Sequence, residues 1–236
     1  MANTSNGVSA PTTRRPRVDG DAVRREAPGP PALFALMRAQ HGVASRRQAR
    51  RAGVSAVVER RLVAEGALVR ALPDILAAGG VPLTFGAAAM AATLRCGAVA
   101  ISHGAAARLH RLPGFERYAG VDVLGDRGNH PRPCPPIIVH YTRGPIDSQL
   151  VRLGSIPVTS LPLTLSMVLP GVDDRHAVAM LHDALARGLP VVTIGAVAEA
   201  WRRHGRAGPT RLLALLDRLA SPDVGRGARA AMEPSR

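Results

Sequence analysis

Three glycines divide the segment after residue 31 into short runs, and this division constrains the fold more than any other feature of the sequence. Gly42, Gly53 and Gly66 each end a run in which apolar residues recur on one side of a helix. Glycine readily takes the left-handed conformation with which many helices end. The sequence therefore predicts three short helices joined by tight turns.

Two serines mark where the second and third of these helices begin. Ser45 is followed three residues later by Gln48, which is the capping-box pattern. Ser55 stands where it can cap the third helix, in which Val58 and Leu62 would face the core. The polar caps and the glycine stops thus agree on the same helices.

A β-hairpin is predicted directly after the helices. In "ALVRALPDILAAGG" two short apolar runs flank Pro73 and Asp74, a pair that favours a turn. Three short helices followed by a hairpin are the elements of a winged helix-turn-helix. We therefore expect such a DNA-binding domain over residues 32–81.

The remaining chain predicts a mixed domain and two tails. Between 82 and 220, Thr84 and Ser102 are plausible helix caps, "GVDVLG", "PPIIVHYTR" and "VRLGSIPVTS" are typical of strands, and helical patterns return from Leu161 onward. The expected fold class is α+β, with the winged helix-turn-helix followed by this mixed helix and strand domain. The ends, residues 1–31 and 221–236, have few groups to bury and are expected to be disordered.

The composition indicates an anionic partner. All 31 basic residues are arginine, the net charge is +14 and the isoelectric point is near 11.6. Nucleic acid is the commonest partner of so basic a chain. The absence of lysine excludes P-loop proteins, Schiff-base enzymes and kinases, each of which needs a lysine.

Cofactors, metals and membranes are not expected. Cys96 and Cys134 lie far apart in the sequence without metal-ligand spacing, so neither a disulfide framework nor a zinc site is predicted. No apolar run approaches the roughly 18 residues that span a bilayer, and no signal peptide is recognisable. We expect a cytoplasmic protein with no membrane partner.

Arginines on the second and third predicted helices form the candidate DNA-binding surface. On the second helix four arginines fall within an arc of about 140°, and they are expected to contact phosphates. On the third helix the face opposite Val58 and Leu62 would enter the major groove, and Arg70 on the hairpin would touch the flanking backbone or minor groove. The predicted DNA-binding residues are Arg46, Arg47, Arg50, Arg51, Ser55, Ala56, Arg60, Arg61 and Arg70.

A catalytic reading of Ser102 and His103 is disfavoured. The pair could be combined with Asp122 or Asp126 as a hydrolase triad, but residues adjacent in sequence are not expected to form the contact between nucleophile and base. Ser102 is instead expected to cap a helix. No catalytic residue is predicted.

The order of several segments resembles a known family. The predicted winged helix is followed by "ISHGAAARL", "VDVLGDRG", "IIVHYTR" and "IPVTSLPLTLSMVLPGVDDRHAVAMLHDALARGL". This series, over roughly residues 32–220, resembles actinobacterial AbiEi proteins, the antitoxins and regulators of type IV toxin-antitoxin systems. The resemblance implies promoter binding by the winged helix, an antitoxin-like second domain with dimer or partner contacts, and a cognate nucleotidyltransferase-like toxin.

The chain departs from the pattern of these relatives at three places. The turn of the wing reads Pro73-Asp74 where relatives have Pro-Gly, and Ser166 stands where they often have an acidic residue. Many relatives also continue into a DUF559-type nuclease domain. The last residues here, "ARAAMEPSR", resemble the segment that precedes that domain, but the chain ends there. The resemblance therefore implies a protein without that nuclease.

The leading hypothesis is a DNA-binding transcriptional regulator of the antitoxin type, without catalytic activity. The alternative is a non-catalytic protein-interaction module, derived from a DUF559-type nuclease-associated protein, whose winged helix no longer reads sequence. Only Arg60 and Arg61 on the third helix are long polar residues that could read bases. An enzyme is disfavoured because lysine and an acidic cluster are missing. The oligomeric state stays open, with a dimer on DNA as one alternative.

Overall fold

The computed structural model describes residues 28–97, 100–125, 134–142, 146–203 and 207–220. It has the α+β class that the sequence predicts. The two segments expected to be disordered lie outside the described residues, except for residues 28–31, where the first helix already begins at Pro30.

Three helices and a small antiparallel sheet form what we call the N-terminal unit, residues 28–78. The strand order is β1-β3-β2, and the hairpin of β2 and β3 follows the third helix. Leu33, Leu62, Leu68 and Leu76 belong to its apolar core. Its elements are α1 (Pro30–Ala39), β1 (Val43–Ser45), α2 (Arg46–Arg51), α3 (Ala56–Ala64), β2 (Leu68–Leu72) and β3 (Ile75–Ala78).

The local signals that predict α2 and α3 act as expected, whereas the strand β1 was not predicted from the sequence. The Gln48 amide donates to Ser45 Oγ at 3.1 Å, and Gln48 Oε1 accepts from the Ser45 amide at 2.8 Å, so the capping box is confirmed. The hydroxyl of Ser55 likewise accepts from the Val58 amide. Gly53, between α2 and α3, has φ +85°, a conformation that residues with a side chain rarely adopt. These local contacts fix where α2 ends and where α3 begins.

A five-stranded sheet, six further α-helices and two 3-10 turns, Asp147–Gln149 and Leu169–Gly171, complete the described chain. The strand order is β6-β5-β4-β8-β7, in which β4 pairs with β8 and β5 with β6 in parallel, and the other neighbours are antiparallel. The strands are β4 (Ala100–Ile101), β5 (Val121–Gly125), β6 (Ile137–Tyr141), β7 (Leu150–Leu153) and β8 (Ile156–Thr159). The α-helices are α4 (Phe85–Cys96), α5 (His103–Leu109), α6 (Leu161–Val168), α7 (Asp174–Ala186), α8 (Val191–Arg202) and α9 (Ala207–Ala220).

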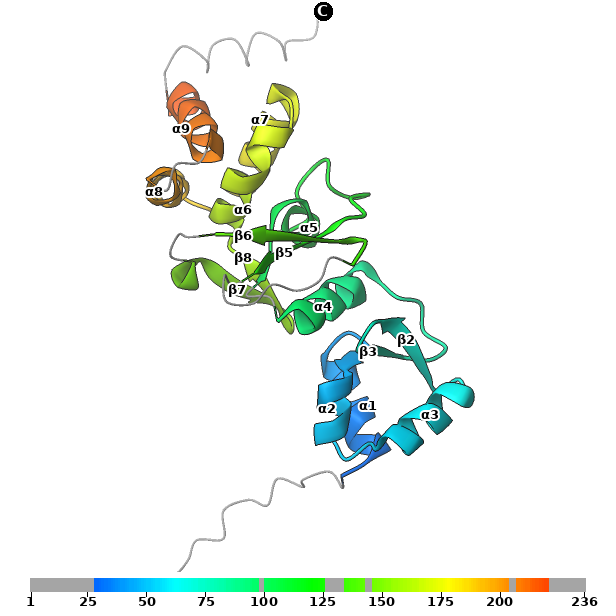
Figure 1. Cartoon of the computed structure of the whole chain (residues 1–236). Coiled ribbons are helices and arrows are strands. Elements are labelled where there is room, and N and C mark those ends of the chain that lie inside the picture. Colours follow the sequence, from blue (N-terminus) through cyan, green and yellow to red (C-terminus); the bar gives the residue numbers. More distant parts are fainter. Residues whose placement is uncertain (1–27, 98–99, 126–133, 143–145, 204–206, 221–236) are drawn as a thin grey trace, which may run out of the picture.

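Helix α4 lies between the N-terminal unit and the larger sheet (Figure 1). It contacts all three strands of the small sheet as well as β5 and β8. Val43, Ile75 and Ala77 of the N-terminal unit belong to the same buried cluster as Ala87 and Ala91 of α4. One apolar core therefore continues from the small sheet into the rest of the protein.

The start of helix α5 differs from the expectation in one respect. Ser102 stands at the N-cap position, but its hydroxyl makes no capping hydrogen bond. The carboxylate of Asp122 on β5 caps the helix instead, because Asp122 Oδ2 accepts a hydrogen bond from the Ala105 amide at 3.0 Å. Thr84, in contrast, caps α4 as predicted. The prediction for Ser102 was wrong because Asp122, from a distant strand, accepts the hydrogen bond of the helix end.

None of the described helices is both long enough and apolar enough to cross a membrane.

Candidate nucleic-acid interface

The four arginines of α2 face two different ways. Arg47 and Arg51 are exposed, and within the described residues they form no ion pair or side-chain hydrogen bond. Arg46 and Arg50, also one turn apart, reach across to α3 and bind Glu59. The common cationic face that the sequence predicts is therefore divided into a pair that Glu59 binds and a pair without such a partner among the described residues.

Glu59 is the buried centre of an ion cluster that joins α2 to α3. Its side chain is 0% exposed. Arg46 Nε and Arg50 Nη2 donate to Glu59 Oε2 at 3.2 and 3.1 Å, and Arg46 Nη2 lies 2.8 Å from Oε1 without hydrogen-bond alignment. Arg50 Nη1 also donates to the carbonyl of Val54 in the turn between the helices, at 2.9 Å. The cluster sets how α3 lies on α2.

Two guanidinium groups on one carboxylate leave that cluster with a single net positive charge. The hydrogen bond to Glu59, together with the charge of its carboxylate, raises the pKa of Arg46 above its usual value. The burial of Glu59 and its ion pairs were not predicted from the sequence, because glutamate side chains are normally exposed to solvent. A signal was present, since Glu59 lies one residue after Val58 and three before Leu62, on the predicted inner face.

The outer face of α3 is exposed as predicted. Ala56, Arg60 and Ala64 are all exposed, and Arg60 forms no ion pair or side-chain hydrogen bond with the described residues. Arg61 lies 3.6 Å from Glu65 one turn later, so part of its charge is balanced. The Ser55 hydroxyl is used in capping, which leaves Arg60 as the principal long side chain on this face.

The hairpin turn does not project from the protein. Asp74 has φ +63°, and its carbonyl accepts from the Arg46 amide at 2.8 Å. On the other side, Arg95 of α4 donates from Nη1 to the Pro73 carbonyl at 3.1 Å. The Asp74 carboxylate lies 4.0 Å from the guanidinium groups of both Arg46 and Arg95. The turn is thus held between α2 and α4. Aspartate suits position 74 because it tolerates the left-handed conformation and because two arginines flank it.

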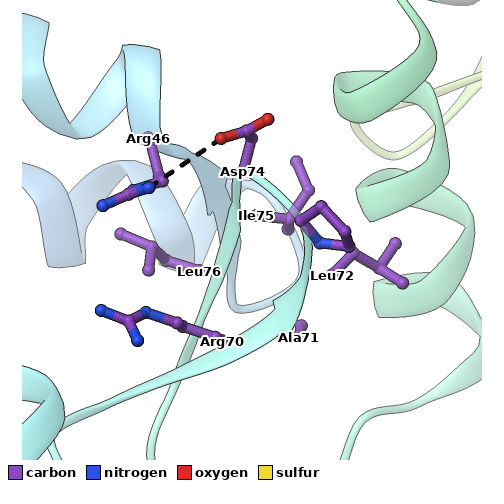
Figure 2. A pocket seen from close by; sticks show the side chains of 8 residues that line it. Arg46, Arg70, Ala71, Leu72, Asp74, Ile75 and Leu76 are labelled. Carbon is purple, nitrogen blue, oxygen red and sulfur yellow. Dashed lines mark ion pairs between the residues drawn. The ribbon is translucent and has the colours of Figure 1, made fainter. Parts of the chain in front are cut away.

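A pocket of about 620 Å³ opens beside this turn (Figure 2). Arg46 and Arg70 extend their guanidinium groups toward the same side, with Leu76 between them, and Asp74 lies at the upper edge. Arg70 is exposed and has no ion-pair or hydrogen-bond partner for its side chain in the described part of the chain. Two of the predicted DNA-binding residues, from α2 and β2, are therefore brought together here.

A second polar cluster lies in the larger sheet, where the sequence analysis considered a triad. Ser102 Oγ does lie 3.0 Å from His103 Nδ1, so the expectation that adjacent residues cannot make this contact was wrong. His103 stacks on His140 with ring centroids 3.8 Å apart, and His140 Nε2 lies 2.8 Å from Asp122 Oδ1. Ser102 is 0% exposed, however, so a substrate has no access to its hydroxyl.

Asp122 is the ionised centre of this second cluster. Burial alone would raise the pKa of Asp122, but hydrogen bonds from His140, Tyr118 and the Ala105 amide hold it below its usual value. Burial and the hydrogen bond to Asp122 raise the pKa of Tyr118, whose ring packs against Gly104. Across the residues that the structure describes, no group of three or more His, Cys, Asp or Glu side chains is placed to hold a metal ion. The cluster joins β5, β6 and α5 through these side chains.

No family model matches the chain, and no curated protein matches it.

Proposed function

We propose that the protein is a DNA-binding transcriptional regulator and that its N-terminal unit is a winged helix-turn-helix. The observation that carries the proposal is the distribution of charge in that unit. Its three acidic side chains, Glu59, Glu65 and Asp74, each lie beside arginines of the protein itself. Among the described residues of the unit, exposed arginines without such a partner remain on four elements. One is Arg38 on α1, and the others, which the sequence predicts to bind DNA, are Arg47 and Arg51 on α2, Arg60 on α3 and Arg70 on β2.

The placement of these arginines suits duplex DNA. Arginines on two helices and a strand can contact phosphates on both sides of a groove, while the outer face of α3 is placed for the base edges. Arg47 and Arg51 would hold phosphates next to the groove, and Arg60 would read a base. In this proposal Arg46 and Arg50 mainly orient α3 through Glu59, in place of the phosphate contacts that the sequence suggested.

A salt titration tests this assignment. Fluorescent duplexes carrying the promoter upstream of the gene, or scrambled sequence, are titrated with protein at several salt concentrations. Each phosphate contact contributes about −0.9 to the slope of log K against log salt. Arg60→Ala should reduce the preference for the promoter, whereas Arg175→Gln on the distant helix α7 should change neither slope nor preference. The absence of binding to either duplex would refute the proposal.

The biological role that we propose is that of an antitoxin in the cytoplasm, with a nucleotidyltransferase-like toxin as the cognate partner. The resemblance of the ordered segments to AbiEi proteins supports it. Co-expression with the neighbouring toxin gene should restore growth, and removal of residues 32–81 should abolish promoter repression. If growth is not restored, the antitoxin role is wrong, even where DNA binding holds.

One observation favours the alternative of a protein-interaction module. Val57 on α3 is 66% exposed and lies between Ala56 and Val58, so the outer face of α3 carries apolar as well as basic side chains. Exposed apolar groups of this kind are common at protein interfaces. If Val57→Ser abolished repression in cells but left the affinity for DNA unchanged, this alternative would be favoured.

A further inference from the structure

A second hollow lies beside the hairpin turn and shares Arg46, Asp74 and Ile75 with the pocket of Figure 2. It has a volume of about 310 Å³, and its charged lining comes from α2, from the turn and from α4. The charged residues are Arg46, Arg47, Asp74 and Arg95. Three cationic groups thus surround one carboxylate, and one of the three belongs to a helix outside the predicted DNA-binding domain.

Arg95 carries a donor that its surroundings leave unused. Its side chain is 16% exposed, and Nη1 is bound to the Pro73 carbonyl. Arg95 Nε is buried and has no hydrogen-bond acceptor among the described residues. Buried polar groups of proteins nearly always have a partner, so the described residues leave the guanidinium of Arg95 incompletely bonded.

The carboxylate already present does not satisfy this site. The Asp74 side chain is 74% exposed, and its oxygens stand 4.0 Å from the guanidinium nitrogens of Arg46 and Arg95. These separations exceed those of charge-assisted hydrogen bonds. Arg47, on the same hollow, is exposed and has no ion-pair partner among the described residues. The hollow therefore keeps a surplus of positive charge and of free donors.

We propose that this hollow binds a phosphate group of the DNA backbone, through Arg47 and Arg95. The proposal rests on the proposed function, because it assigns the phosphate to DNA. A strand that crosses the hairpin turn would place one phosphate here and another at Arg70, in the pocket of Figure 2. The DNA-contacting surface then extends onto α4, beyond residues 32–81.

Asp74 sets the strength of this site. Its carboxylate lies at the rim of both hollows and repels a phosphate in either of them. Asp74→Asn removes that charge, and asparagine tolerates the left-handed conformation of this position. This variant should bind DNA more tightly than the natural protein and should show a steeper salt dependence. A gain of affinity of this kind does not arise from misfolding.

The experiment measures the affinity for duplex DNA at several salt concentrations, with the full chain and matched variants. Arg47→Gln and Arg95→Gln should each flatten the slope of log K against log salt by about 0.9. Arg95→Lys keeps the charge and should lose less DNA affinity than Arg95→Gln. Arg38→Gln on α1 is the control for the loss of an exposed arginine elsewhere. Unfolding temperatures identify a variant whose fold is damaged. An Asp74→Asn protein with unchanged affinity and slope would overturn the proposal.

A second experiment distinguishes a phosphate of DNA from free inorganic phosphate. The unfolding temperature is measured with increasing inorganic phosphate, and with sodium chloride at matched ionic strength. If DNA binds but Arg47→Gln, Arg95→Gln and Asp74→Asn leave the slope unchanged, the phosphate site is wrong and the proposed function stands. If DNA does not bind at all, the proposed function fails, and the assignment to DNA fails with it. Stabilisation by inorganic phosphate that Arg95→Gln removes would then identify a site for free phosphate.

Discussion

At the scale of single residues, the arginines of α2 divide by what they bind. Removing Arg46 and Arg50 together would leave the fully buried Glu59 without a cation, which is a costly loss. We expect the unfolding temperature of the double alanine variant to fall by roughly 10 °C. The double alanine variant of Arg47 and Arg51 should unfold at nearly the natural temperature and flatten the salt slope by about two units. Calorimetry and DNA titration of both variants check this, and reversed effects would contradict the role given to Glu59.

A second residue-scale prediction concerns pH. Burial lowers the pKa of His110, whose Nε2 lies 2.8 Å from the Thr159 carbonyl. Because the unfolded chain takes up this proton first, the stability that His110 contributes is complete above pH about 6.5 and is lost as the pH falls below it. His110→Gln can keep a donor for Thr159 without titrating. The free energy of unfolding, measured by denaturant between pH 7 and pH 5, should therefore fall less steeply in the variant. Equal slopes for the two proteins would contradict this.

At the scale of elements, the hairpin depends on a close backbone contact at its base. A Cβ atom at Gly79 would lie 1.8 Å from the Gly66 carbonyl oxygen, which is backbone and cannot move aside alone. Gly79→Ala should therefore separate the end of α3 from the hairpin and cost about 2 kcal/mol or more of stability. Gly171→Ala is the control, because nothing lies within 4 Å of its Cβ. Denaturant unfolding compares the two, and a stable Gly79→Ala protein would show that the contact is not needed.

At the scale of the whole molecule, the N-terminal unit shares its core with α4. Val43, Ile75 and Ala77 are buried in the same cluster as the alanines of α4. A fragment of residues 28–81 would expose this face, with a loss of roughly 3 kcal/mol or more. We expect that fragment to unfold at a much lower temperature than a fragment of residues 28–97, which keeps α4. Circular dichroism on heating measures both. Similar unfolding temperatures would mean that the N-terminal unit is stable alone.

The helices, the hairpin and the α+β class could be predicted from the sequence because their signals are local. Ser45 meets Gln48 within one turn, Gly53 needs only its own φ angle, and Pro73-Asp74 form the turn between the strands that they separate. Each of these interactions joins residues a few positions apart. The exposed face of α3 followed from the same helical periodicity.

The partners of charged side chains were decided by the tertiary structure alone. Glu59 captures two arginines of α2, Asp122 replaces Ser102 at the start of α5, and Arg95 of α4 reaches the hairpin turn. These contacts join residues between 9 and 22 positions apart on different elements. They depend on how helices and strands pack, which the shared apolar core determines. An arginine-rich sequence therefore specifies where cations are available, and packing decides which of them have no partner within the described part of the protein.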